Sequence, residues 1–239
     1  MVLSHKVLKL PLRHRESRPF AAFVLLPALL ALTVSPIVAG IMPPVRMKVV
    51  GADDGTPLVG VVALLWGTAH EGTITGHGGK QAILFAVEAA SDQSGELRFP
   101  KQSFRSRPFF LNTNYEGPSM LLLKPGYAPL VLQNERRIVP TLAEASTWEH
   151  DGRTLRMKKA TDDDVRRQAY LVGTSTNLML GLDGDCPWKR VPRVLVTADR
   201  LFRGPGATST LRTLFLNDAL FVQIGCGSPK SFFEPYLRP

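Results

Sequence analysis

A tight turn that leads into an apolar strand, residues 53–61, is the feature that most constrains the fold of this chain. The turn reads Asp53-Asp54-Gly55-Thr56, and Pro57-Leu58-Val59-Gly60-Val61 follows it. Asp accepts hydrogen bonds from nearby backbone, Gly tolerates positive φ and Pro fixes φ, so this run ends one segment and starts the next. Two later runs, residues 91–99 and 124–127, repeat the same turn chemistry.

Short apolar segments separated by turns of this kind occupy residues 43–133. The predicted strands cover residues 45–50, 59–66, 81–91, 96–99, 109–111, 120–123 and 130–132. A loop from Gly67 to Lys80 and an irregular basic connection over residues 100–108 join some of them. Strands of this length with closely spaced turn signals predict a small antiparallel sandwich.

The three turn-containing runs, taken in order, resemble the carboxypeptidase regulatory-like domain, a transthyretin-like β-sandwich. The family's Asp-x-Thr-Gly-like turn with Pro-Leu-x-Gly-Val corresponds to residues 53–61, and its Lys-x-Gly-Tyr to Lys124-Pro125-Gly126-Tyr127. Its Thr-Asp-x-x-Gly-x-Phe-x-Phe corresponds to residues 91–99, where Leu97 replaces an aromatic residue. The resemblance covers residues 44–133 and implies the sandwich fold.

Residues 134–239 predict a mainly helical region with an extended tail, so the expected fold class is α+β. One more strand is expected over residues 153–158. Thr161 is a helix cap, Pro192 begins a second helix, and a third covers residues 209–224. The residues at helical spacing are Val165, Ala169, Val172, Thr176, Met179 and Leu182; Val194, Leu195, Ala198, Leu201 and Phe202; and Leu211, Leu214, Phe215, Asp218 and Val222. Three prolines after residue 228 predict the extended tail.

The N-terminus has the order of a secretory signal. Basic residues from Lys6 to Arg18 precede an apolar run from Phe20 to Val38, and small residues follow at Ala39-Gly40. The alternative is a retained membrane anchor, because the run is almost long enough to span a bilayer. The predicted organisation is a signal peptide or anchor at 1–39, the sandwich at 40–133 and the helical region at 134–239. Without residues 1–39 the net charge falls from +9 to +5, which is weak support for nucleic-acid binding.

Export changes how the two cysteines, Cys186 and Cys226, are interpreted. In an oxidising compartment an isolated pair is most simply a disulfide, whereas two reduced thiols would be expected in the cytosol. The segment Asp185-Cys186-Pro187-Trp188 also resembles one found in exported bacterial proteins that carry such a sandwich followed by helices. That second resemblance implies no activity.

No catalytic motif and no cofactor are predicted. A zinc carboxypeptidase has a His-x-x-Glu ligand pair, and no His in this chain has Glu three residues later. His70, Glu71 and His77 are the metal candidates, but their irregular spacing fits a polar loop better. Three acids at residues 162–164 fit helix capping better than calcium binding.

The leading hypothesis is an exported, non-catalytic binding or assembly module of the periplasm or cell surface. Its expected partner is a protein or another envelope component, bound through an exposed sheet edge, and not nucleic acid. Two alternatives remain open. One is a metal-dependent hydrolase with its site between Gly67 and Lys80. The other is a structural envelope protein anchored in the inner membrane by the run from Phe20 to Val38.

Overall fold

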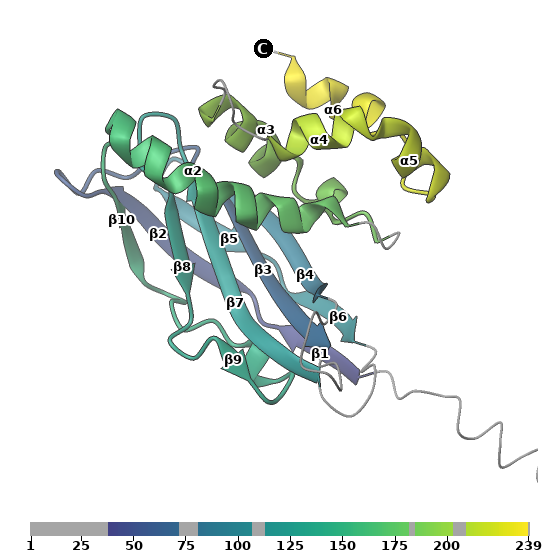
Figure 1. The fold of residues 1–239 in the computed structure, drawn as a ribbon. Helices are drawn as coiled ribbons and strands as arrows, with labels where there is room; N and C mark the ends of the chain where they lie inside the picture. Colours follow the sequence, from purple (N-terminus) through teal and green to yellow (C-terminus); the bar gives the residue numbers. More distant parts are fainter. Residues whose placement is uncertain (1–37, 72–80, 107–112, 182–184, 203–208, 239) are drawn as a thin grey trace, which may run out of the picture. The chain divides into compact units, whose positions relative to one another are not determined.

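The strands of the protein form three sheets in the computed structural model, which describes residues 38–71, 81–106, 113–181, 185–202 and 209–238 (Figure 1). The first sheet pairs β1 (Val38–Met42) with β6 (Gln102–Ser106), antiparallel. The second, the small sheet, has the order β10 (Thr154–Met157), β2 (Val45–Gly51), β5 (Glu96–Phe99). In it β10 runs parallel to β2 and β5 runs antiparallel.

The third sheet, the large sheet, has the order β4-β3-β7-β8, with all neighbours antiparallel. Its strands are β4 (Gln81–Ala90), β3 (Val62–Glu71), β7 (Thr113–Leu123) and β8 (Leu130–Gln133). A two-residue strand, β9 (Ile138–Val139), also pairs with β7. Within the described ranges β4 has one strand neighbour, β3, so its other side is a sheet edge.

Helices follow the strands along the chain, and the predicted α+β class is therefore confirmed. The 3₁₀ helices are η1 (Glu144–Ser146), η2 (Leu178–Leu180) and η3 (Pro187–Arg190). The α-helices are α2 (Asp162–Asn177), α3 (Pro192–Leu201), α4 (Thr210–Leu216), α5 (Asp218–Gln223) and α6 (Pro229–Leu237). As predicted, Thr161 caps α2 and Pro192 lies at the start of α3. The structure adds that Thr161 forms a capping box with Asp164.

The large sheet is buried on both faces, because alternate residues of its strands enter two different cores. Leu65 and Leu122 join a cluster that includes Met47 and Leu97 of the small sheet. Leu64, Trp66, Leu121 and Leu123 join a second cluster with residues of η3 and α2–α6. Two-sided burial explains why the central strands are almost continuously apolar in sequence.

Several predicted strand limits are wrong. Val59 and Gly60 form a turn, in which Gly60 has φ +71°, and Val61 follows it outside any strand. β3 begins at Val62 and continues through Gly67 to Glu71. The predicted loop therefore starts later than Gly67; residues 72–80 lie outside the described part.

The connection predicted over residues 100–108 contains β6, and β7 starts at Thr113 rather than Met120. These segments contain few apolar residues, so the alternation that marks a strand is weak in them. The strand predicted over 109–111 lies outside the described residues.

The helical prediction needs two corrections. The third helix breaks at Asn217 into α4 and α5, and the change in direction buries Phe221 while leaving Val222 51% exposed. The tail is not extended: Ser228 caps α6, Pro229 occupies its first turn, where no N–H donor is needed, and Phe233 is buried. Of the first predicted stripe, Val172, Thr176 and Met179 are buried, whereas Val165 and Leu182 are not among the described side chains.

Strand pairing joins residues on both sides of the predicted segment limits at 39/40 and 133/134. Val38 and Ala39 belong to β1, and β10 pairs with β2 although it lies beyond residue 133. Residues 37–239 form one compact unit. The strand predicted over residues 153–158 is confirmed, and it joins the helical half of the chain to the small sheet.

Candidate functional site

The three turn-containing runs meet at residues 58–61. The hydroxyl of Ser91, which is buried, donates to the carbonyl of Leu58 at 2.6 Å and accepts from the amide of Val61 at 2.8 Å. The ammonium of Lys124 donates to the carbonyl of Val59 at 2.7 Å. Gly95 fits here because its φ is +76° and an added Cβ would lie 2.5 Å from the carbonyl oxygen of Val49. The runs therefore form one structural joint.

The carboxylates in this joint are bonded within their own turns. Asp54 accepts from the amide and hydroxyl of Thr56, and these bonds lower the pKa of Asp54. Hydrogen bonds from the hydroxyl of Ser94 and the amide of Glu96 lower the pKa of Asp92 in the same way. Both side chains stabilise turns rather than face a ligand.

Of the three metal candidates, the described structure includes only the side chain of His70. His70 lies in β3, with Nε2 3.2 Å from Oε1 of Glu116. Glu116 also accepts from the hydroxyl of Thr68 at 2.8 Å and pairs with the guanidinium of Arg137 at 3.2 Å. The side chain of Glu71 and all of His77 are outside the described part, and within it no three potential ligands gather into a metal site.

The Glu116 cluster is an ion-pair arrangement. Burial acts to raise the pKa of Glu116, but the hydrogen bonds from Thr68 and His70 and the positive charge of Arg137 outweigh it, so the pKa lies below its usual value. The carboxylate is therefore ionised at neutral pH and already bonded by three neighbours. This arrangement suits structural bracing of β3 and β7 better than proton transfer.

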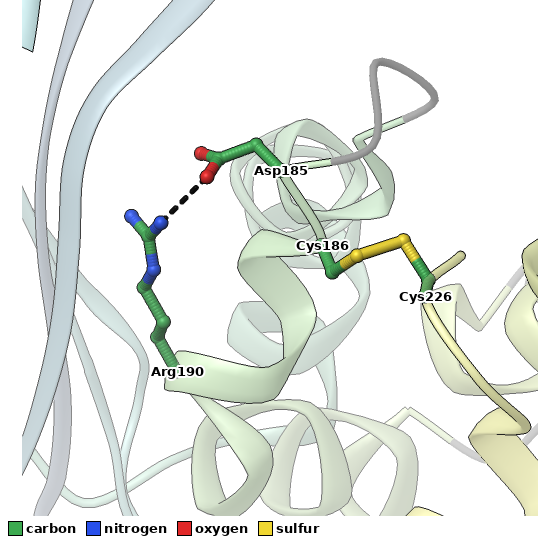
Figure 2. Close-up of a disulfide and its surroundings, with 4 residues drawn as sticks. All are labelled: Asp185, Cys186, Arg190 and Cys226. Carbon is green, nitrogen blue, oxygen red and sulfur yellow. Dashed lines mark hydrogen bonds and ion pairs between the residues drawn. A yellow bond between two sulfur atoms is a disulfide. The ribbon is translucent and has the colours of Figure 1, made fainter. Parts of the chain in front are cut away.

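Cys186 and Cys226 form the predicted disulfide, with 5.6 Å between their Cα atoms (Figure 2). Cys186 has φ +47° and immediately precedes η3, and beside it Asp185 pairs with Arg190 at 2.6 Å. The fully buried Trp188 of η3 packs against Phe221, Phe232 and Phe233. The bond thus joins η3 to the segment between α5 and α6, and it indicates an oxidising, exported environment.

A hollow of about 450 Å³ lies beside the edge strand β4. Ile83, Leu84 and Phe85 line it from β4, and Gln102, Ser103 and Phe104 line it from β6. The Asp185–Arg190 ion pair of Figure 2 completes the lining. The pairing register of β3 and β4 skips Leu84, so β4 bulges there and directs both Leu84 and Phe85 into the first core.

This edge of β4 has few of the features that prevent strand pairing. Proteins commonly protect long edges with charges, prolines, bulges or short strands. The bulge at Leu84 is one such feature, but residues 81–87 contain neither a charge nor a proline, and β4 is ten residues long. The carboxylate of Glu88 is engaged elsewhere, accepting from the amide of Val194 at the start of α3. The sequence contained this signal in its charge-free run, but it did not show that β4 lies at an edge.

A second hollow, of about 300 Å³, lies between α2, α3 and α4. Its most buried polar groups are bonded to one another. The hydroxyl of Thr210 lies 2.8 Å from that of Thr176 and donates to the side-chain oxygen of Asn177. Because these groups satisfy each other, the β4 hollow is the better candidate for a binding site.

In the described residues no helix is long and apolar enough to cross a membrane. The apolar run from Phe20 lies outside them, apart from Val38 in β1.

No family model and no curated protein matches this chain. One similar solved structure is 3-chlorocatechol 1,2-dioxygenase from Rhodococcus opacus 1CP: 16% identity, 51% of this chain, 58% of that chain and a TM-score of 0.25. Another is a 9R-lipoxygenase from Cyanothece PCC8801: 12% identity, 73% of this chain, 26% of that chain and a TM-score of 0.25. The chain spans less than two thirds of either protein, and TM-scores this low carry no conclusion about fold or activity.

Proposed function

We propose that this protein is an exported binding or assembly module of the periplasm or cell surface that accepts an extended segment of a partner protein along the edge of β4. The observation that carries the proposal is the hollow beside this ten-residue edge strand. Strand addition of this kind derives its affinity from backbone hydrogen bonds and its specificity from pockets that take alternate side chains. It requires no catalytic residue.

The backbone pattern of β4 provides the donors and acceptors. The amide of Ser91 donates to the carbonyl of Val61, which places the Val61–Ser91 pair in the hydrogen-bonded position of the ladder. Pairs alternate along antiparallel strands, so the amide and carbonyl of Ala86 point away from β3. Ala86 is only 3% exposed, so a partner strand would first have to displace the chain that covers this position. A partner strand paired at Ala86 would continue past Leu84, where the bulge lies beside the hollow.

The outer edges of β8, β5 and β10 are less suitable. β8 is four residues long, and the edges of the small sheet, β5 and β10, carry Arg98 and Arg156. Short length and charge both oppose strand addition. The hydrolase alternative would require ligands in addition to His70, and the membrane-anchored alternative depends on the run from Phe20. Both remain open as predictions.

We further propose that the β region is a transthyretin-like sandwich of the carboxypeptidase regulatory-like type. Two features support this proposal. The three runs that carry the resemblance meet at residues 58–61, and the small and large sheets contribute to one hydrophobic core.

The proposal is tested by a photo-crosslinking residue at Ser103 in the full-length exported protein. The same probe at Thr154, on an edge strand of the small sheet, is the matched control. If a partner crosslinks to the probe at Ser103 but not to the probe at Thr154, its crosslinked segment is identified by peptide mapping. A synthetic peptide with the sequence of that segment is then titrated against the protein. We expect Ser103→Trp, which fills the hollow, to weaken peptide binding at least about tenfold, and Thr154→Trp to leave it unchanged. Equal effects of the two substitutions would refute the proposed site.

A further inference from the structure

The outward face of the small sheet gathers positive charge. Alternation along its strands places four cationic side chains on this face, which we call the basic face: Arg46, Lys48, Arg98 and Arg156. Among the strand residues that share the face, Glu96 is the one acid. The excess is local, because the chain beyond residue 39 has a net charge of only +5.

The charges of the basic face are arranged at a cost to stability. Arg46 lies directly opposite Arg98 in the β2–β5 register, and like charges in that position repel each other. Arg98 is compensated by Glu96 at 2.7 Å, and Lys48 lies opposite Glu96. In the described ranges, no hydrogen bond or ion pair involves the guanidinium of Arg46 or Arg156 or the ammonium of Lys48.

Arginines elsewhere in the described structure are mostly neutralised. Those that form an ion pair with a carboxylate are Arg136, Arg137, Arg166, Arg167, Arg190, Arg193 and Arg238. Three of the four cations of the basic face, Arg46, Lys48 and Arg156, have no carboxylate partner among the described residues, although the protein pairs most of its arginines. Such a face is complementary to an external anion. A hollow of about 330 Å³ on this face is lined by Arg46, Lys48 and Ser94, and also by Glu96, whose carboxylate is paired with Arg98.

We propose that the basic face docks on an anionic phospholipid surface through the phosphates of the headgroups. Clusters of four to eight Lys and Arg residues bind such surfaces, with about 1 kcal/mol from each cation near the membrane, or about fivefold in affinity. A sheet presents its cations in one layer, which suits a planar array of phosphates. Single-stranded nucleic acid fits the face less well, because its binding relies on aromatic side chains for base stacking, and the residues of this face include none.

The proposal is tested by vesicle sedimentation of the full-length protein. The measured quantity is the ratio of binding to vesicles containing phosphatidylglycerol over binding to pure phosphatidylcholine vesicles. Insertion of the N-terminal apolar run would contribute to both, so the ratio reports the charged face. We expect a ratio of at least tenfold at low salt that falls towards one at 0.5 M salt, because salt screens exposed charges.

Three variants assign the effect to the basic face. Arg46→Gln, Lys48→Gln, Arg98→Gln and Arg156→Gln together should abolish the preference, while replacing the three arginines by lysine should retain it. The matched control removes the same charge from the helices, with Arg166→Gln, Arg167→Gln, Arg200→Gln and Arg212→Gln, and should keep the preference. A ratio near one for the natural protein would overturn the proposal. So would equal losses in the face and control variants, or basic-face-dependent binding of single-stranded DNA without vesicle binding.

Discussion

The β region and the helical region are held together by different kinds of interaction. In the β region, Ser91 and Lys124 each bond the backbone of residues 58–61, so short hydrogen bonds connect three turns. In the helical region, Trp188 packs among phenylalanines of α5 and α6, and the Cys186–Cys226 bond closes the same corner across 40 residues. The hydrogen-bonded turns can be recognised from short stretches of sequence, whereas the packing around Trp188 and the disulfide depends on residues far apart in the chain.

The largest effect is expected from truncating the centre of the helical core. Trp188→Ala removes a fully buried ring and its contacts with three phenylalanines, which should cost about 3–5 kcal/mol of unfolding free energy. Urea unfolding measures the loss, and hydrogen exchange should show that α3–α6 lose protection before β3 and β7. Trp148→Ala, in the core shared by the two sheets, is the matched control and should give the reverse order. The same order in both variants would mean that the two cores are not separable.

Loss of the disulfide is expected to have a comparable but slightly smaller effect. Cys226→Ser opens a link across 40 residues, which the chain-entropy model values at about 3–4 kcal/mol. A reductant should lower the thermal midpoint of the natural protein towards that of the variant and leave the variant itself unchanged. If the reductant shifts both proteins equally, the effect does not arise from this bond.

In the β region, the most informative single change is Ser91→Ala. It leaves the amide of Val61 and the carbonyl of Leu58 without their side-chain partner in a buried site, at an expected cost of about 1–3 kcal/mol. Ser94→Ala removes an exposed hydroxyl from the same turn and should cost under about 1 kcal/mol. Chemical denaturation of both variants measures the difference. Equal losses of unfolding free energy in the two variants would contradict a role for Ser91 in holding the turn-containing runs together.

The smallest expected effects are opposite pH dependences at two glutamates. Burial raises the pKa of Glu88, although hydrogen bonds from the start of α3 act in the opposite direction. The contribution of Glu88 to stability is therefore present at low pH and is lost as pH rises through the folded pKa. The lowered pKa of Glu116 gives the opposite: its contribution is present above pH ~4.5 and is lost as pH falls through the folded pKa. The urea midpoint is measured between pH 3 and 8. In Glu88→Gln its fall at high pH should be absent, and in Glu116→Gln its fall at low pH should be smaller than in the natural protein. Parallel curves for both variants and the natural protein would contradict these assignments.

The same contrast explains how much could be predicted from sequence. Local chemistry identified the helix cap at Thr161, the start of α3 near Pro192 and the turns around Asp54 and Asp92 correctly. It missed α6, because prolines in the tail suggested an extended chain although Pro229 sits where a helix tolerates it. The burial of Phe233 against Trp188 is a long-range contact that the local sequence does not signal.

The candidate binding surfaces were only partly predictable for the same reason. The charge-free run of β4 and the alternating cations of β2 are visible in the sequence. The position of β4 at an edge, the closeness of β6 and the opposition of Arg46 to Arg98 depend on strand order and register. His70 was assigned to a loop because Gly67 lowers the β signal, and the ladder with β7 is what extends β3 to Glu71.

Strand addition at β4 is tested most directly by amide hydrogen exchange of the full-length protein, with and without the partner segment captured from Ser103. A segment paired with the outer edge should slow exchange at Ala86, whose amide points away from β3, and leave β10 and β8 unchanged. Slowed exchange in β10 or β8 with no change at Ala86 would contradict strand addition at β4 and assign the interaction to another edge.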